Sequence, residues 1–192
     1  MLASNIKHIF IAIGLVLIAS LIYVFGTSMI FFSSGNHLEL SYLLAIICFM
    51  PLGFIIIPHL IAQKNSLYSN EYDIHFSWKS YLLIAVLIFI ANLFFIKSNE
   101  YFQQMIISAC EEFLFRFVLY KILRKHYQYW PTIIITSLLF GFVLHLNYPF
   151  MDNLLIRTPA GIVFSLLASH LGLQYAIAGH WLYNLVISQI HF

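Results

Sequence analysis

Three groups of polar side chains interrupt long apolar stretches in the second half of the chain. The first is CEEFLFR, residues 110–116, which carries two adjacent carboxylates and an arginine inside a run that is otherwise apolar enough to lie in lipid. The second is His145, at the end of SLLFGFVLHL, and the third is His180 with Asn184 in AGHWLYNLV. An ionised side chain at the centre of a lipid-facing helix costs about 2.5–3.5 kcal/mol. We therefore expect these side chains to face the inside of a helix bundle.

Helical spacing separates the roles of the two carboxylates. Glu112 and Arg116 are four residues apart, so they share one helical face, with the acid before the base in the favourable order for an ion pair. Glu111 points about 100° away from that face. The sequence predicts that Glu112 and Arg116 neutralise each other and that Glu111 stays free for another role. The alternative is that all three charges only hold helices together.

A free carboxylate, two imidazoles and a carboxamide form a set that can activate water toward a peptide bond. Glu111 suits a general base, and His145 can orient or deprotonate the water. His180 and Asn184 share a helical face, from which a side-chain N–H can stabilise the oxyanion. The three residues Glu111, His145 and His180 are also an acceptable ligand set for a divalent metal such as zinc, with water in the fourth position. Zinc-bound and metal-free water both remain open at this point.

The order of these motifs resembles the CAAX protease and bacteriocin-processing family (CPBP, also called Abi) of intramembrane endopeptidases. That family is marked by E-E-x-x-x-R, F-x-x-x-H and H-x-x-x-N on separate transmembrane helices. EEFLFR, residues 111–116, and HWLYN, residues 180–184, match in full. The resemblance covers roughly residues 101–190. It implies that Glu111 and His145 activate the water, that Glu112 and Arg116 are supporting residues, and that His180 and Asn184 bind a metal or the oxyanion.

The second motif departs from this pattern by one residue. Phe140 precedes His145 by five residues instead of four, which turns its face by about 100° in an α-helix. We expect it to be a packing residue for which Phe142 or Leu138 can substitute. His170 is the other histidine in this stretch, and we assign it to the end of a span.

Composition places these motifs in a membrane protein. The 192 residues are 62% hydrophobic and 8% charged, with a mean hydropathy of +0.91, which is outside the range of soluble domains. We predict an all-α polytopic transmembrane bundle of six or seven spans, forming a single membrane-embedded domain over residues 1–192 with its catalytic core at about 101–190.

The net charge of +2 does not indicate nucleic-acid binding, and Cys48 and Cys110 lie in apolar runs that imply no disulfide. We place the spans near residues 9–32, 40–62, 80–96, 101–120, 131–147, 154–169 and 174–190.

The spans limit how the motifs can meet. The sixth is short enough to be tilted or re-entrant. His145 lies about fifteen residues into its span and His180 about seven, a difference in depth near 10 Å at 1.5 Å per residue. We therefore expect tilted or offset helices around a water-filled cavity.

The basic residues concentrate in loops that we assign to one side, which predicts a cytoplasmic N-terminus. The abundance of Ile, Phe, Tyr and Asn indicates an AT-rich bacterial genome, so we expect a bacterial plasma membrane. The expected partners are the lipid bilayer and, as the family resemblance implies, a peptide or membrane-associated protein substrate in bacteriocin immunity or peptide-signal processing. Two other functions compete with the protease. One is a catalytically silent scaffold or immunity protein, and the other is a proton-coupled transporter.

Overall fold

The structure is a computed structural model that describes residues 2–28, 38–71 and 73–190. Within these ranges it consists of helices and the loops between them, with no strand, as predicted. Seven continuous helical stretches match the seven expected spans to within four residues, except that the first begins seven residues earlier, at Leu2. Residues 29–32 of the first expected span lie outside the described ranges. The elements are α1 (Leu2–Ser28), α2 (Leu38–Met50), η3 (Pro51–Ile56), α3 (Ile57–Lys64), α4 (Trp78–Ala91), η4 (Asn92–Ile96), α5 (Tyr101–Glu112), η5 (Phe113–Leu119), α6 (Tyr120–Arg124), α7 (Tyr129–Leu138), η6 (Leu139–Leu144), α8 (Phe150–Asp152), η7 (Asn153–Arg157), α9 (Thr158–His170) and α10 (Leu173–Ile190).

By length and composition, four of these stretches could cross a membrane: Ile6–Ser28, Leu38–Lys64, Trp78–Ile96 and Phe150–His170. The stretch Tyr129–Leu144 is apolar but shorter. The sixth span is longer than the sequence suggested, because its helix begins at Phe150 and runs for 21 residues. Pro159 does not end the helix; it lies at the second position of α9, directly after the π segment η7.

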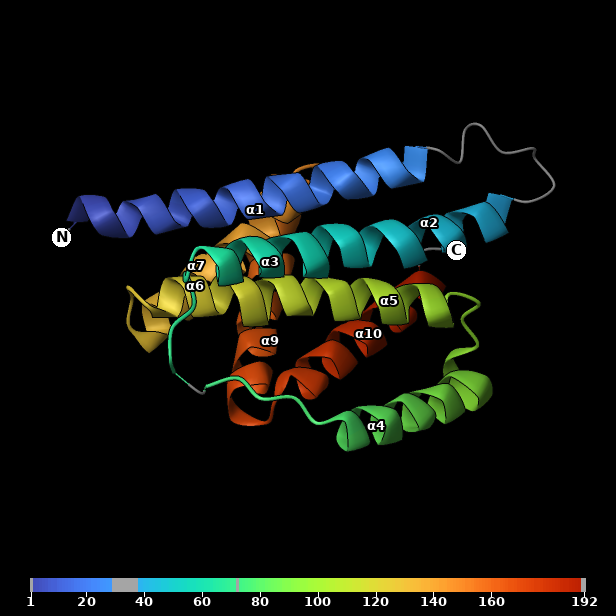
Figure 1. The fold of residues 1–192 in the computed structure, drawn as a ribbon. Helices are drawn as coiled ribbons and strands as arrows, with labels where there is room; N and C mark the ends of the chain where they lie inside the picture. Colours follow the sequence, from blue (N-terminus) through green and yellow to red (C-terminus); the bar gives the residue numbers. More distant parts are fainter. Residues whose placement is uncertain (1, 29–37, 72, 191–192) are drawn as a thin grey trace.

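The helix that carries the first motif lies at the centre of the bundle. The continuous stretch α5–η5–α6 packs along α10 and contacts α2, α7 and η3 (Figure 1). In Figure 1, α1 and α2–α3 run alongside it, while α9 and α10 cross below it at an angle. Leu114, Phe115, Val118 and Leu119 of η5 are fully buried in the main hydrophobic cluster. The surrounding apolar helices thereby hold the central helix by side-chain burial.

The basic loops meet at one end of the bundle. The side chain of Lys125 donates to Ser66 O at 2.6 Å, and Arg124 pairs with Asp73 at 2.9 Å. The start of α1 is at the same end, where the ring of His8 stacks on that of His126 with centroids 3.6 Å apart. That this end faces the cytoplasm stays a prediction.

Candidate active site

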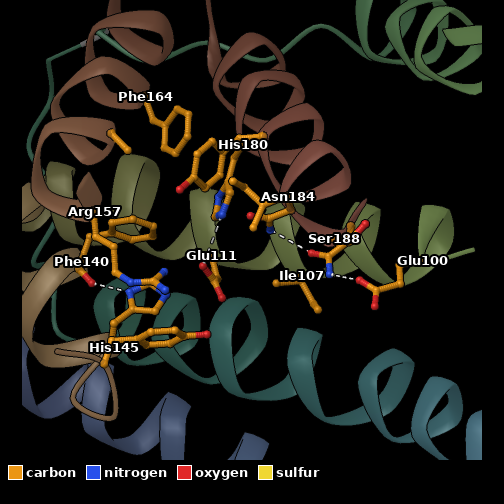
Figure 2. Close-up of a pocket in the computed structure, with 15 residues that line it drawn as sticks. Glu100, Ile107, Glu111, Phe140, His145, Arg157, Phe164, His180, Asn184 and Ser188 are labelled. Atoms are coloured by element: carbon orange, nitrogen blue, oxygen red, sulfur yellow. Dashed lines mark hydrogen bonds and ion pairs between the residues drawn. The ribbon is translucent and has the colours of Figure 1, made fainter. Parts of the chain in front are cut away.

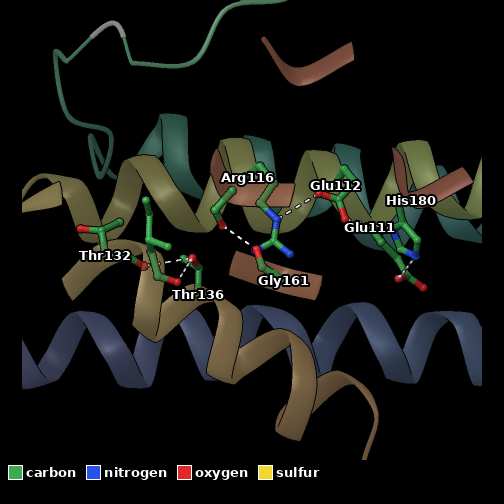
Figure 3. Close-up of polar contacts among 9 residues, drawn as sticks. Glu111, Glu112, Arg116, Thr132, Thr136, Gly161 and His180 are labelled. Carbon is green, nitrogen blue, oxygen red and sulfur yellow. Dashed lines mark hydrogen bonds and ion pairs between the residues drawn. The ribbon is translucent and has the colours of Figure 1, made fainter. Parts of the chain in front are cut away.

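The ion pair expected from helical spacing is present on the central helix. Arg116 Nε donates to Glu112 Oε2 at 3.0 Å, and both side chains are completely buried (Figure 3). The guanidinium also faces the ring of Phe140, with its Cζ 5.1 Å from the centroid. Two charges buried in this way are tolerated because each compensates the other.

Glu112 has a second partner that the sequence did not reveal. Its Oε1 lies 2.9 Å from Nδ1 of His180, which reaches it from α10. Because a carboxylate accepts hydrogen bonds, this contact assigns the Nδ1 proton to His180 and turns Nε2 toward the cavity. The ring of Phe164 stacks on the same imidazole at 5.0 Å and 16°. His180 is therefore fixed by a charge at one nitrogen and by an aromatic ring on its face.

Glu111 is the free carboxylate of the motif. Its Oε2 lies 3.8 Å from His180 Nε2, which is too long for a hydrogen bond. No described residue donates a hydrogen bond to its carboxylate, and its side chain keeps 12% of its surface exposed. Glu111 can therefore accept a proton from a molecule in the cavity.

His145 is held from its other side by the backbone. Its Nδ1 lies 2.8 Å from Phe140 O, and because a carbonyl oxygen only accepts, Nδ1 must donate. The neutral ring then has its lone pair on Nε2. The ring of Phe140 lies 4.9 Å from the His145 ring and 5.6 Å from the His180 ring. One phenylalanine thus contacts both imidazoles, and neither Phe142, which packs on Phe150, nor Leu138, which is 40% exposed, replaces it.

A π-helical turn accommodates the extra residue of the second motif. Residues Leu139–Leu144 form η6, whose i→i+5 turns contain one residue more than α turns. The turn therefore offsets the rotation that an α-helix would impose between Phe140 and His145. The family's spacing would put the aromatic ring at Gly141, where even a Cβ would overlap Thr158 Oγ1 and lie 2.9 Å from Asn153 O. Close packing of η6 against η7 leaves no room for a side chain there.

Asn184 is positioned by a chain of amide hydrogen bonds along α5. Its Nδ2 donates to Gln104 Oε1 at 2.8 Å, and Gln104 Nε2 donates to Glu100 Oε2 at 2.8 Å. A carboxamide has two N–H groups, so one remains for a ligand. Gln104 stands seven residues before Glu111, on the same helical face, and this spacing could have identified it from the sequence.

The four predicted catalytic side chains line one cavity of about 430 Å³ (Figure 2). The inclined helices of the bundle bring His145 and His180 to the same cavity despite the depths expected from straight, level spans. His170 lies elsewhere, near the hydroxyl of Tyr129. The cavity also contains residues that the sequence analysis did not assign to a site: Glu100, Gln104, Tyr148, Arg157, Phe164 and Ser188.

In this structure the side chains of Glu111, His145 and His180 are not arranged as a metal site. Among the described residues, no group of three His, Cys, Asp or Glu side chains is close enough to hold a metal ion. The distance of 3.8 Å between Glu111 and His180 agrees with this. Zinc binding by Glu111, His145 and His180 stays a prediction, and no step below depends on it.

Comparison with known proteins agrees with the motifs. The family described as type II CAAX prenyl endopeptidase Rce1-like matches residues 78–186, which include all three motifs. No curated protein and no solved structure gave a significant match. The chain therefore belongs to the Rce1-like family of CAAX-type membrane proteases.

Proposed function

We propose that this protein is an intramembrane endopeptidase in which Glu111 and His145 activate a water molecule for attack on a peptide carbonyl. The observation that carries the proposal is the convergence of four side chains from three helices on one cavity inside an apolar bundle. A glutamate without a hydrogen-bonding partner and an imidazole with a free Nε2 are the two proton acceptors that such a reaction needs.

The proposed reaction follows from these contacts. Glu111 takes one proton from the water, and His145 Nε2 accepts a hydrogen bond from the other O–H, while the water oxygen bonds to the carbonyl carbon. His180 Nε2, 3.8 Å from Glu111 Oε2, is close enough to contact the same water. The free N–H of Asn184 donates to the carbonyl oxygen as it becomes negative. The proton then passes to the leaving nitrogen, the C–N bond breaks, and a carboxylic acid and an amine leave. Glu112 and Arg116 touch neither the water nor the peptide in this scheme; they orient His180.

A cleavage assay with the purified protein in detergent tests the proposal. The substrates are a farnesylated, internally quenched CAAX peptide and an unmodified peptide library read by mass spectrometry. Glu111→Gln should lower cleavage by a factor of about 100 or more, because it removes the general base. Glu39→Gln, at an exposed position on α2, is the matched control and should cleave normally. Unchanged cleavage by Glu111→Gln would remove this residue from the mechanism.

The competing functions have their own outcomes in the same preparation. The altered second motif is the sequence feature that favours a catalytically silent scaffold, and the π turn η6 offsets its extra residue. Absence of cleavage of any peptide by the wild-type protein would favour the scaffold. Proton flux in proteoliposomes that Glu111→Gln abolishes would favour the transporter.

The zinc alternative and the physiological role also belong to this proposal. Bound zinc would supply an activated water, and its test is metal analysis of the purified protein with a chelator titration. Loss of cleavage on chelation and recovery with zinc would support the metal form. A role in bacteriocin immunity or peptide-signal processing in a bacterial plasma membrane rests on the family resemblance and needs genetic tests.

A further inference from the structure

The two ends of the cavity differ in charge. Figure 2 shows Arg157 and His145 at one end, Glu111 and His180 in the middle, and Glu100 at the other end. A bound peptide that places its scissile bond at Glu111 must extend toward both ends. Its two halves therefore meet groups of opposite sign.

Arg157 differs from the other two arginines of the chain. Arg116 is paired with Glu112, and Arg124 with Asp73. Arg157, the last residue of η7, forms no ion pair within the described chain, and its buried Nε has no hydrogen-bonding partner there. A guanidinium in an apolar helix is costly without a close ion-pair partner, and the opposite charge within its electrostatic reach is Glu111, which lines the same cavity. Arg157 is retained here on the wall of the cavity that contains the proposed catalytic groups.

The orientation of Arg157 suits an anionic ligand. Its Cζ lies 3.6 Å from the ring centroid of Tyr148, a contact that supports the flat face of the guanidinium. A guanidinium supported on its face keeps its N–H groups available at the edge, where they can bind both oxygens of a carboxylate.

We propose that Arg157 binds the terminal carboxylate of the substrate and so sets the direction of the peptide in the cavity. This inference rests on the proposed function. The segment released from the C-terminus lies between Glu111 and Arg157, and the upstream part of the substrate extends along Gln104 toward Glu100. The negative charge of Glu100 repels a carboxylate from the opposite end, so the reverse binding direction is disfavoured. Arg157 is thus a specificity-determining residue for cleavage near a free C-terminus.

The test compares peptides that differ only at the C-terminus. The same library is prepared as free acids and as C-terminal amides, and kcat/KM is measured for the wild-type protein and for Arg157→Gln, Arg157→Lys and the control Arg124→Gln. The wild-type protein should prefer acids by a factor of about 10–100, the range of a hydrogen bond to a charged group. Arg157→Gln should lower cleavage of the acids to that of the amides and leave the amides unchanged, and Arg157→Lys should keep part of the preference. Arg124→Gln should keep all of it.

A binding assay separates this inference from the proposed function. Fluorescence anisotropy of labelled acids and amides on Glu111→Gln protein should show the same preference for acids without any cleavage, and Glu111→Gln/Arg157→Gln should lose it. If the wild-type protein cleaves nothing, the proposed function fails while the binding assay still decides the role of Arg157. Equal binding of acids and amides, or an equal loss of both in Arg157→Gln, would overturn the inference. Amides that bind only when they contain Asp or Glu would assign the carboxylate to a side chain and overturn it as well.

Discussion

The close approach of η6 to η7 at Gly141 makes a quantitative prediction. In Gly141→Ala the new methyl group would overlap Thr158 Oγ1 and lie 2.9 Å from the backbone oxygen of Asn153, whereas ordinary contact begins at 3.4 Å. The two segments must separate by about 0.5 Å or more. Overpacking of this kind typically lowers the free energy of unfolding by about 1–3 kcal/mol. His145 directly follows η6, so a shift of η6 also moves His145. Displacement of a reacting group by about 1 Å can lower the rate about 100-fold.

Thermal unfolding in detergent and the peptide cleavage assay would measure the two effects. Gly14→Ala is the matched control, because no atom lies within 4 Å of its new Cβ, and it should be as stable and active as the wild type. The double variant Gly141→Ala/Thr158→Ala should recover part of the loss, since it removes the overlapping hydroxyl. A fully stable and active Gly141→Ala protein would refute the reasoning that packing at this glycine fixes the position of His145.

Three further predictions concern other contacts. Gln104→Leu frees Asn184 from its hydrogen bond and should lower kcat by up to about 10-fold with little change in KM, as steady-state kinetics would show; a change confined to KM would contradict a positioning role. Arg116→Met leaves the buried Glu112 charge uncompensated and should cost about 3–5 kcal/mol in denaturant unfolding, whereas Glu112→Gln/Arg116→Met should be less destabilised than Arg116→Met alone. Burial, and then the neighbouring His8 and Lys125, lower the pKa of His126 from its ordinary 6.5, so the folded state favours the neutral ring. Stability should therefore fall as pH drops below that value, and His126→Gln should weaken this dependence in melting curves recorded against pH.

Helical period and hydropathy predicted much of the fold. Seven apolar runs became seven helical stretches, and the four-residue spacing of Glu112 and Arg116 gave their ion pair. Both results depend on interactions within one helix or between a helix and its surroundings, which a sequence displays directly.

The contacts between helices could not be predicted in the same way. The bond from His180 to Glu112 joins residues 68 positions apart, and no periodicity specifies how two helices cross. The π turns were also missed, because an apolar stretch such as LFGFVL has no residue pattern that distinguishes a π turn from an α turn. The place of Arg157 in the cavity could not be predicted either, since it depends on the course of α9 across the bundle.

The order of the site residues along the chain has a consequence for biosynthesis. Glu111, His145, His180 and Asn184 are spread over the second half of the sequence, and Asn184 lies on the last described helix. When the first five helical stretches have been synthesised and inserted, the chain contains Glu111 but neither His180 nor Asn184. Hydrolytic competence would arise only once the helix that carries His180 and Asn184 has been inserted, so a shorter nascent chain would not digest its neighbours at the translocon.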